Sequence, residues 1–200
     1  MNDHYYTARP NAKSQRKTIE ATIRGVTLRF LTDASVFSKD QIDFGSRLLI
    51  EAMELPEAGT VLDVGCGYGP IGLFASKLSQ EKVQVFLTDI NERALELARE
   101  NAKLNGLERV HIVGGDVYDG LPDGMTFDCI LCNPPIRAGK AIVYRIFEEA
   151  PARLNEGGTL WVVIRKQQGA PSARKKLEDI FPQVEEKARK KGYHIFCAYT

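Results

Sequence analysis

The 200-residue sequence lacks the features that mark membrane-spanning, secreted and metal-binding proteins. No uncharged apolar run reaches the roughly 18 residues that a membrane-spanning helix needs. The opening sequence, MNDHYYTARP, has no apolar core of the signal-peptide kind. The four cysteines do not have the spacing of a disulfide framework, and the three histidines are scattered along the chain. We therefore expect a cytoplasmic protein with no membrane segment and no metal site.

An excess of one charge is also nearly absent, since the net charge is only +1. That balance hides a division, because residues 1–50 carry a net +3, residues 51–136 carry −8 and residues 137–200 carry +6. Basic ends around an acidic middle suit a polyanionic partner that the ends approach. An unevenly charged, solvated surface explains the same numbers, so both interpretations stay open.

The composition is that of an ordinary globular protein. Hydrophobic residues make up 44% of the chain and charged residues 26%, which excludes a disordered tail or a fibrous rod. A chain of this length fits one domain. We expect that domain over residues 1–200, with an arm, a hairpin and a helix in residues 1–55 and the core in residues 56–200.

Short apolar segments alternate with helical segments through most of the chain. Alternation around Arg24-Gly25 predicts a β-hairpin over 18–31, and the helical spacing at 42–53 predicts a helix. The remaining expected strands are 61–64, 83–88, 110–113, 127–131 and 160–165, and the remaining helices are 71–78, 92–104, 141–154 and 172–181. Residues 184–199 predict a closing hairpin, although its first arm also suits a helix.

This order predicts an α/β fold, an open and mostly parallel sheet with helices on both faces. Ligands of such sheets bind beyond the carboxyl ends of the strands. In this sequence, glycines and acidic residues follow three of the predicted strands.

A glycine-rich turn follows the first of these strands, with the sequence DVGCGYG at residues 63–69. Gly65, Gly67 and Gly69 have no Cβ, so the backbone can turn sharply and approach a nucleotide-like ligand closely. Asp63 closes the strand before the turn and Asp89 closes the next strand. Asp89 is placed to hold a ribose diol, and Asp63 suits a ligand with a positively charged amino-acid end.

A dinucleotide site competes with this interpretation. Gly67, Gly69 and Gly72 satisfy the glycine fingerprint, and Asp89 stands 20 residues beyond Gly69. Two features disfavour a pyrophosphate, namely the acidic Asp63 before the turn and Pro70 within it. S-adenosylmethionine carries an ammonium and a sulfonium and no phosphate, so it fits better. Asp116, after the third strand, is placed to accept a hydrogen bond from adenine, or else caps a turn.

The tetrapeptide NPPI at residues 133–136 ends the fourth strand and carries the most information. Two consecutive prolines hold the backbone rigid. The Asn133 side-chain carbonyl and the Pro134 backbone carbonyl can accept both N–H groups of a planar amine and aim its nitrogen at an electrophilic methyl group. A stiff strand exit without chemistry is the simpler alternative.

Together these segments resemble class I S-adenosylmethionine-dependent methyltransferases, in the branch that methylates exocyclic or amide nitrogens. More narrowly, the chain is similar to the ribosomal RNA small-subunit methyltransferase C family, which acts on guanine N2 of 16S ribosomal RNA. The narrower likeness rests on HYY at 4–6, TIEATIRG at 18–25, VFSK at 36–39, DFGS at 43–46, NPPIRAGK at 133–140 and RKQQGAPS at 165–172.

The resemblance implies a Rossmann-like, seven-stranded sheet with an antiparallel last strand and an N-terminal β-hairpin extension. It implies S-adenosylmethionine as the cofactor and ribosomal RNA or the small ribosomal subunit as the partner. Two sets of residues would carry the function: the cofactor contacts Asp63, Gly65, Gly67, Gly69, Asp89, Asp116 and Asn133, and the catalytic segment Asn133, Pro134, Pro135 and Ile136.

The sequence departs from the family in two ways. Ile136 stands where related nitrogen methyltransferases often have Tyr or Phe to stack on the base, which leaves the exact acceptor nitrogen open. Many members also carry a second, N-terminal methyltransferase-like domain, which these 200 residues do not contain.

The expected reaction is therefore methyl transfer to an exocyclic nitrogen of a nucleobase, first of all guanine N2 in 16S ribosomal RNA. Three alternatives stay open: a protein glutamine or adenine-N6 methyltransferase with the same tetrapeptide, a nicotinamide-dependent oxidoreductase, and a non-catalytic RNA-binding module. A monomer and a weak dimer are both compatible with the sequence.

Other residues carry weaker signals. Cys129 and Cys132, three apart in a strand, are expected on opposite faces as core residues. The aromatic side chains of Tyr5, Tyr6 and Phe37 suit base stacking or closure of the core edge. Four basic residues beside strand ends are candidates for phosphate contacts: Arg137, Lys140, Arg165 and Lys166.

Overall fold

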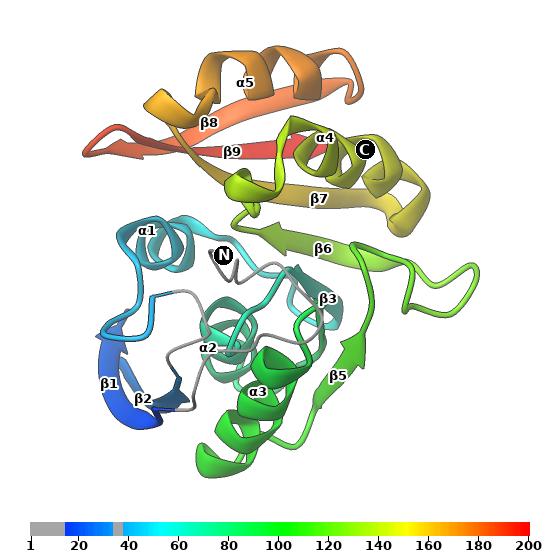
Figure 1. Ribbon diagram of the computed structural model, residues 1–200. Helices are drawn as coiled ribbons and strands as arrows, with labels where there is room; N and C mark the ends of the chain where they lie inside the picture. Colours follow the sequence, from blue (N-terminus) through cyan, green and yellow to red (C-terminus); the bar gives the residue numbers. More distant parts are fainter. Residues whose placement is uncertain (1–14, 34–37) are drawn as a thin grey trace.

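A seven-stranded sheet with the order β5-β4-β3-β6-β7-β9-β8 forms the centre of the computed structural model, which describes residues 15–33 and 38–200 (Figure 1). The strands are β3 (Gly59–Val64), β4 (Val83–Asp89), β5 (Val110–Gly114), β6 (Phe127–Cys132), β7 (Leu154–Arg165), β8 (Gln183–Lys190) and β9 (Tyr193–Tyr199). Within this sheet β9, the last strand of the chain, is inserted antiparallel between β7 and β8, whereas β3 to β7 pair in parallel. The predicted sheet, its antiparallel last strand and the closing hairpin are confirmed.

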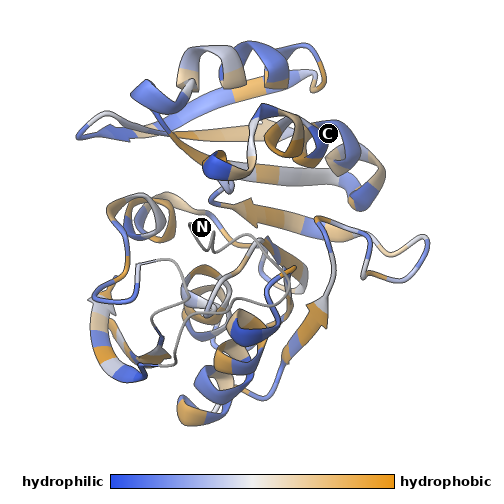
Figure 2. Cartoon of the chain, viewed as in Figure 1, coloured by the Kyte–Doolittle hydropathy of each residue, from blue (hydrophilic) through white to orange (hydrophobic). Residues whose placement is uncertain are grey.

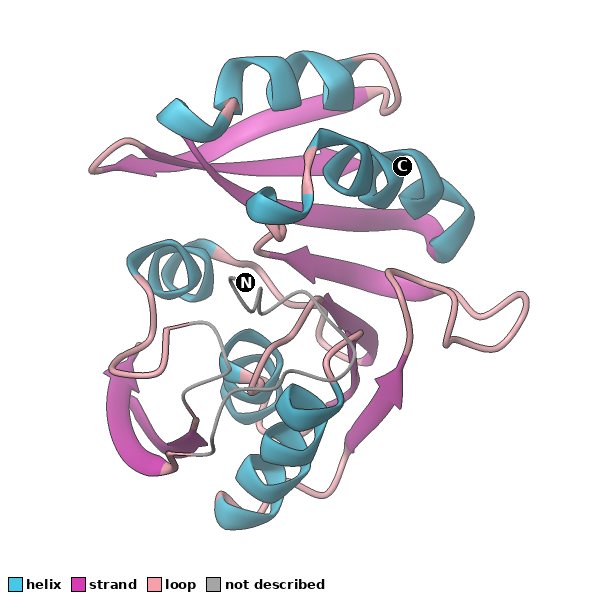
Figure 3. Ribbon diagram, viewed as in Figure 1, coloured by secondary structure: helices cyan, strands magenta, loops and turns pink. Residues whose placement is uncertain are grey.

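Helices cover both faces of this sheet (Figure 3). The bounds are α1 (Phe44–Ala52), α2 (Pro70–Leu78), α3 (Glu92–Leu104), α4 (Lys140–Glu149) and α5 (Ala170–Glu178), with 3-10 turns η1 (Ile136–Ala138), η2 (Ala150–Arg153) and η3 (Lys166–Gln168). The buried residues of α1, α2 and α3 belong to one hydrophobic core, and those of α4 and α5 belong to a second. None of the helices within residues 15–33 and 38–200 has the length and apolar character of a membrane span.

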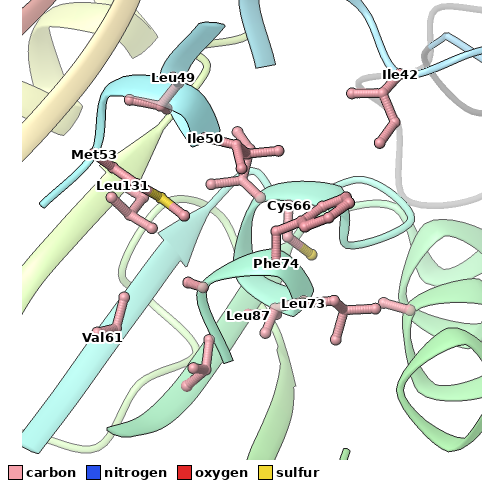
Figure 4. Packing of buried hydrophobic residues seen from close by; sticks show 14 of the residues in the cluster. Ile42, Leu49, Ile50, Met53, Val61, Cys66, Leu73, Phe74, Leu87 and Leu131 are labelled. Carbon is pink, nitrogen blue, oxygen red and sulfur yellow. The ribbon is translucent and has the colours of Figure 1, made fainter. Parts of the chain in front are cut away.

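The sheet separates these two cores because successive strand residues point to opposite faces. Cys129 lies in the first core and Cys132 in the second, as their spacing predicts. In the first core, Leu49 and Ile50 of α1 and the following Met53 pack with Phe74 of α2 above the strands (Figure 4). Each such side chain contributes about 1.5–3 kcal/mol on burial. Figure 2 shows β5, β6 and β9 mainly in the hydrophobic colour.

The N-terminal hairpin, β1 (Lys17–Ile23) and β2 (Val26–Thr32), forms a separate two-stranded sheet beside the first core. Its turn residues Arg24 and Gly25 have φ of 52° and 78°, which is the type I′ geometry of a two-residue hairpin. The Arg24 guanidinium donates to the Met53 carbonyl at the end of α1 over 3.0 Å. The turn thereby attaches the hairpin to α1.

The outer edge of β2 is paired by side chains of α3. Asn101 accepts from Leu31 N at 2.6 Å and donates to Leu31 O at 3.0 Å. Asn105 makes the same pair of bonds with Arg29, at 3.0 and 2.7 Å. Four helix residues rise by about 6.0 Å, which nearly matches two strand residues (about 6.8 Å), so asparagines four apart reach strand residues two apart. The helix therefore satisfies an edge that would otherwise be free to pair with another strand.

Two elements differ from the sequence predictions, and one prediction concerns residues that the structure does not describe. The helix expected over 141–154 ends at Glu149, because Pro151 has no N–H group and begins a 3-10 turn. Strand β7 begins at Leu154 rather than at residue 160. The sequence did not predict this first part because it contains Gly157-Gly158, and glycine has a low strand propensity. The aromatic residues Tyr5, Tyr6 and Phe37 lie outside the described residues.

We predict that Asn101→Ala lowers the free energy of unfolding by about 3 kcal/mol, because it leaves Leu31 N, Leu31 O and Tyr68 O without their side-chain partner. Asn105→Ala is the control, since its bonds to Arg29 are exposed and water can replace them. Urea unfolding measures both. Equal and small losses in the two variants would contradict the pairing of α3 with β2.

Candidate active site

The turn after β3 forms the floor of the site. Gly65, Gly67 and Gly69 have φ of 70°, 58° and 97°, a left-handed conformation that costs other residues about 1–2 kcal/mol each. A Cβ on Gly65 or Gly67 would meet no atom within 4 Å. Backbone conformation therefore demands these two glycines, and the space above them is open to a ligand.

The second half of the glycine motif serves helix packing instead. A Cβ on Gly72 would lie 2.9 Å from Leu87, and one on Gly69 would lie 3.1 Å from the same side chain. Pro70 occupies the first turn of α2, where it removes an N–H group. Gly72 N donates to Asp63 Oδ2 over 2.8 Å. Two of the donors that a pyrophosphate would need at this helix end are thus missing or already used.

Asp89 fixes the glycine turn to the end of β4. Its Oδ2 accepts from Gly67 N and its Oδ1 from Asn91 N, each over 2.8 Å. Burial raises the pKa of this carboxyl, and the backbone hydrogen bonds oppose that shift. Each oxygen keeps a second lone pair, and the side chain lines the cleft. Asp89 can therefore accept a hydrogen bond from a ligand hydroxyl while it holds the turn.

Asp63 lies beneath the turn and is completely buried. Its Oδ1 has no hydrogen-bond partner among the residues that the structure describes. Burial raises its pKa from 3.8 to about 7, and the neighbouring Asp89 charge adds to this effect. The side chain does not line the cleft, so any effect of Asp63 on a bound ligand would have to come from its electric field or from a rearrangement of the turn.

A cleft of about 730 Å³, its open mouth included, lies between the glycine turn, the start of α1 and the end of β6. A smaller hollow of about 250 Å³ shares Gly65, Asp89 and Pro135 with it and extends to Gly115 and Val117. The two together suit an elongated ligand that passes over Asp89.

Asn133 enters this cleft with a defined orientation. Its Nδ2 donates to Asp43 Oδ2 at 3.2 Å and to Ser46 Oγ at 2.9 Å. The Asp43 carboxylate also caps α1, because its Oδ1 accepts from Gly45 N and Ser46 N. A carboxylate only accepts, so it turns the amide N–H group of Asn133 toward itself. Asn133 Oδ1, which has no partner in the described part of the chain, is left as the acceptor.

Sequence reasoning missed Asp43 and Ser46 as site residues. The signal available was an aspartate at the start of a predicted helix, which indicates a cap but not its second partner. Asp43 and Asn133 are 90 residues apart, and only the fold brings them together.

The prolines after Asn133 form a tight turn. Pro135 has φ −74° and ψ 76°, and the Pro134 carbonyl accepts from Ile136 N at 2.8 Å, as in an inverse γ-turn. The carbonyl keeps one lone pair for a ligand. Asn133, Pro134 and Pro135 line the cleft, whereas Ile136 packs beside the second core.

Asp116 lies next to the smaller hollow, between Gly115 and Val117. Its carboxylate forms a salt bridge of 3.0 Å with Arg145, which also pairs with Asp119 and Glu149. The Asp116 side chain is thus engaged with Arg145 of α4, and its expected contact with adenine stays a prediction.

We predict that Asp63→Asn reduces the pH dependence of stability. With a pKa near 7, folded Asp63 keeps a proton that the unfolded chain releases above pH 3.8, so wild-type stability falls between about pH 4 and 7 and levels off above that. The variant lacks this loss, which amounts to at most about 4 kcal/mol. Its stability relative to the wild type should therefore rise from pH 5 to pH 8 in urea unfolding. If the free energies of unfolding of variant and wild type differed by the same amount at pH 5 and pH 8, the raised pKa of Asp63 would be contradicted.

Comparison with known proteins gives concordant results. The family model of the methyltransferase small domain matches residues 27–197. "Uncharacterized protein YbxB" of Bacillus subtilis (strain 168) is 47% identical over 199 residues, which cover 99% of this chain and 98% of that protein.

Two named relatives are longer. Ribosomal RNA small subunit methyltransferase C of Hamiltonella defensa is 36% identical and covers 64% of this chain, and ribosomal RNA large subunit methyltransferase G of Shewanella denitrificans is 34% identical and covers 76%. The chain spans 38% and 41% of the length of these two proteins.

Among solved structures, the T. thermophilus 16S rRNA N2 G1207 methyltransferase (RsmC) in complex with AdoMet and guanosine has a TM-score of 0.83 and 25% identity. The match covers 96% of this chain and 52% of that one. The family model covers the glycine turn, the acidic strand ends and Asn133, and the chain belongs to the methyltransferase small domain family.

Proposed function

We propose that this protein transfers the methyl group of S-adenosylmethionine to guanine N2 in ribosomal RNA, first of all 16S ribosomal RNA. The observation that carries the proposal is the orientation of Asn133, whose Nδ2 is held by Asp43 and Ser46 so that Oδ1 is left to accept. An acceptor pair at the end of the fourth parallel strand suits a substrate that presents two N–H groups. The exocyclic amine of guanine is such a group.

The residues of the cleft fit this cofactor. S-adenosylmethionine supplies an activated methyl group on a sulfonium and carries no phosphate. Asp89 would hold the ribose hydroxyls, and the backbone of Gly65 and Gly67 would line the amino-acid end. The buried carboxylates of Asp63 and Asp89 favour a cationic ligand. Gly115 and Val117 would flank the adenine, with Asp116 beside them.

Asn133 and Pro134 would perform the positioning. Asn133 Oδ1 and the free lone pair of Pro134 O would each accept one N–H of the amine. This arrangement aims the nitrogen lone pair at the methyl group, and position alone can supply much of the acceleration of such a transfer. The methylated nitrogen is cationic and loses its extra proton to water, so no strong general base is required. The base must leave its stack to reach the cleft.

The alternatives differ in their support. Adenine-N6 and glutamine amide groups could use the same two acceptors, and the named RNA methyltransferases among the relatives favour a nucleobase. A nicotinamide cofactor has less support, because Pro70 and the Gly72–Asp63 bond leave few N–H groups at the start of α2 for a pyrophosphate. A non-catalytic RNA-binding module would bind RNA without turnover.

We predict that Asn133→Ala lowers kcat on unmodified 16S ribosomal RNA at least about 100-fold, since the amine loses one of its two positioning bonds. The affinity for S-adenosylhomocysteine should change less than about twofold, because the glycine turn and Asp89 are untouched. Methyl transfer with tritiated cofactor and calorimetric titration measure the two quantities. Turnover at the wild-type rate would refute the role of Asn133.

We predict that Asp43→Asn also lowers kcat, at least about tenfold, although asparagine caps a helix as well as aspartate does. Its Oδ1 would accept from Gly45 N and Ser46 N, so its Nδ2 would face the Asn133 Nδ2. Two donors cannot bond, and the Asn133 carboxamide would rotate and present N–H instead of Oδ1 to the amine.

Ser46→Ala is the matched control for this variant, because it removes one acceptor of Asn133 but leaves the carboxylate that sets its orientation. We expect a smaller loss of kcat there, and an unchanged melting temperature in Asp43→Asn. A folded Asp43→Asn variant with wild-type kcat would show that Asp43 does not orient Asn133.

A further inference from the structure

We infer that six exposed cations beside the cleft form a binding surface for the phosphates of the RNA strand that leads to the target base. We call them the cationic edge: Arg137, Arg165, Lys166, Arg189, Lys190 and Lys191. This inference rests on the proposed RNA substrate and names the part of the protein that binds it.

The sheet register places the cationic edge at the same end as Asn133. Cys132, the last residue of β6, pairs with Val162, so β7 runs three residues further, to Arg165, or about 10 Å beyond β6. Tyr193 pairs with both Arg165 and Lys190, which puts the β8–β9 turn at this end of β7 (Figure 1). The turn is joined to η3, since Lys166 N donates to Gly192 O over 2.7 Å.

The β8–β9 turn also contacts the helix start that orients Asn133. The Tyr193 ring lies 5.5 Å from the Phe44 ring, and a Cβ on Gly45 would lie 2.9 Å from Tyr193. Phe44 follows Asp43 directly in the chain. An RNA strand bound along this turn would therefore reach the cleft, and the predicted amine acceptors in it, within a few nucleotides.

Cations flank these two half-exposed rings. Lys191 Nζ lies 4.9 Å above the Phe44 ring, and the Arg165 guanidinium lies 5.5 Å from the Tyr193 ring. Positive charge beside aromatic rings is the combination that single-stranded nucleic-acid sites use, with phosphates on the charges and bases on the rings. Figure 2 shows hydrophilic residues at the tip of the turn.

No described carboxylate neutralises the cationic edge. Elsewhere in the C-terminal part, Arg145, Arg174, Lys176 and Lys187 each have a carboxylate within 4 Å. Over residues 15–33 and 38–200, no carboxylate lies that close to any member of the cationic edge. Uncompensated charge next to a cleft raises the local concentration of a polyanion and steers its approach.

The two hairpin turns of the chain show the same contrast. Arg24-Gly25 and Lys191-Gly192 both have positive φ at both residues, with 52° and 78° in the first and 49° and 77° in the second. The Arg24 guanidinium bonds to the protein itself, since it donates to the Met53 carbonyl. Lys191 donates no hydrogen bond to any described residue, and its Nζ lies over the Phe44 ring. Its charge is left for an external partner.

The test compares two triple variants that remove equal charge. The edge variant is Lys166→Gln/Lys190→Gln/Lys191→Gln. The control variant is Lys77→Gln/Lys82→Gln/Lys103→Gln, whose lysines are also exposed and lie at the opposite end of the sheet, at the ends of α2 and α3 and before β4. The probe is a fluorescent single-stranded RNA of about 20 nucleotides, and its binding is followed by anisotropy over a series of KCl concentrations.

We expect the edge variant to bind this RNA at least about tenfold more weakly at low salt. The slope of log K against log [KCl] should become shallower by about 2, since each lost phosphate contact on a single strand removes about 0.7. The control variant should stay within about twofold of the wild type, and all three proteins should bind S-adenosylhomocysteine equally. Wild-type RNA affinity in the edge variant, or an equal loss in the control, would overturn the inference.

Methyl transfer separates this inference from the proposed function. If the wild type methylates 16S ribosomal RNA, the edge variant should have a KM for the RNA at least about tenfold higher and a kcat within about twofold of the wild-type value. An unchanged KM would overturn the cationic edge but not the proposed reaction. If the wild type methylates no RNA but the edge variant still loses RNA affinity, the proposed reaction fails and the cationic edge stands.

Discussion

The cleft depends on the turn after β3, whose residues must adopt left-handed φ angles and leave the space on the cleft side of the turn open. Glycines make that backbone accessible, and two buried carboxylates hold it: Asp89 accepts from Gly67 N, and Asp63 accepts from Gly72 N. Both carboxyls have raised pKa values because they are buried. A cationic ligand in the cleft would favour the ionised form of these carboxyls and would offset part of the cost of burying their charge.

A second constraint joins the cleft to the rest of the chain through the start of α1. Asp43 caps this helix with one oxygen and holds Asn133 with the other. The next residue, Phe44, packs on Tyr193 at the β8–β9 turn. The other end of α1 accepts a hydrogen bond from the N-terminal hairpin through Met53. One helix therefore positions Asn133, the β8–β9 turn and the hairpin relative to one another.

Local patterns in the sequence predict most of the fold and part of the site. The strand and helix periodicities, the glycine turn, Asp89 and the Asn133-Pro134-Pro135 segment all lie within short stretches, so their spacing alone reveals them. Contacts between distant residues do not appear in such patterns. The bonds of Asn133 with Asp43, of Asn101 with Leu31 and of Asp116 with Arg145 join residues 90, 70 and 29 apart. They were missed because only the folded chain brings these side chains together.

The proposed methyl transfer to guanine N2 is tested most directly by the identity of the methylated nucleoside. Unmodified 16S ribosomal RNA would be incubated with the protein and S-adenosylmethionine carrying a deuterated methyl group, digested to nucleosides and analysed by mass spectrometry. Label in N2-methylguanosine is expected. Label in N6-methyladenosine instead, or no label in any nucleoside, would contradict the proposed reaction.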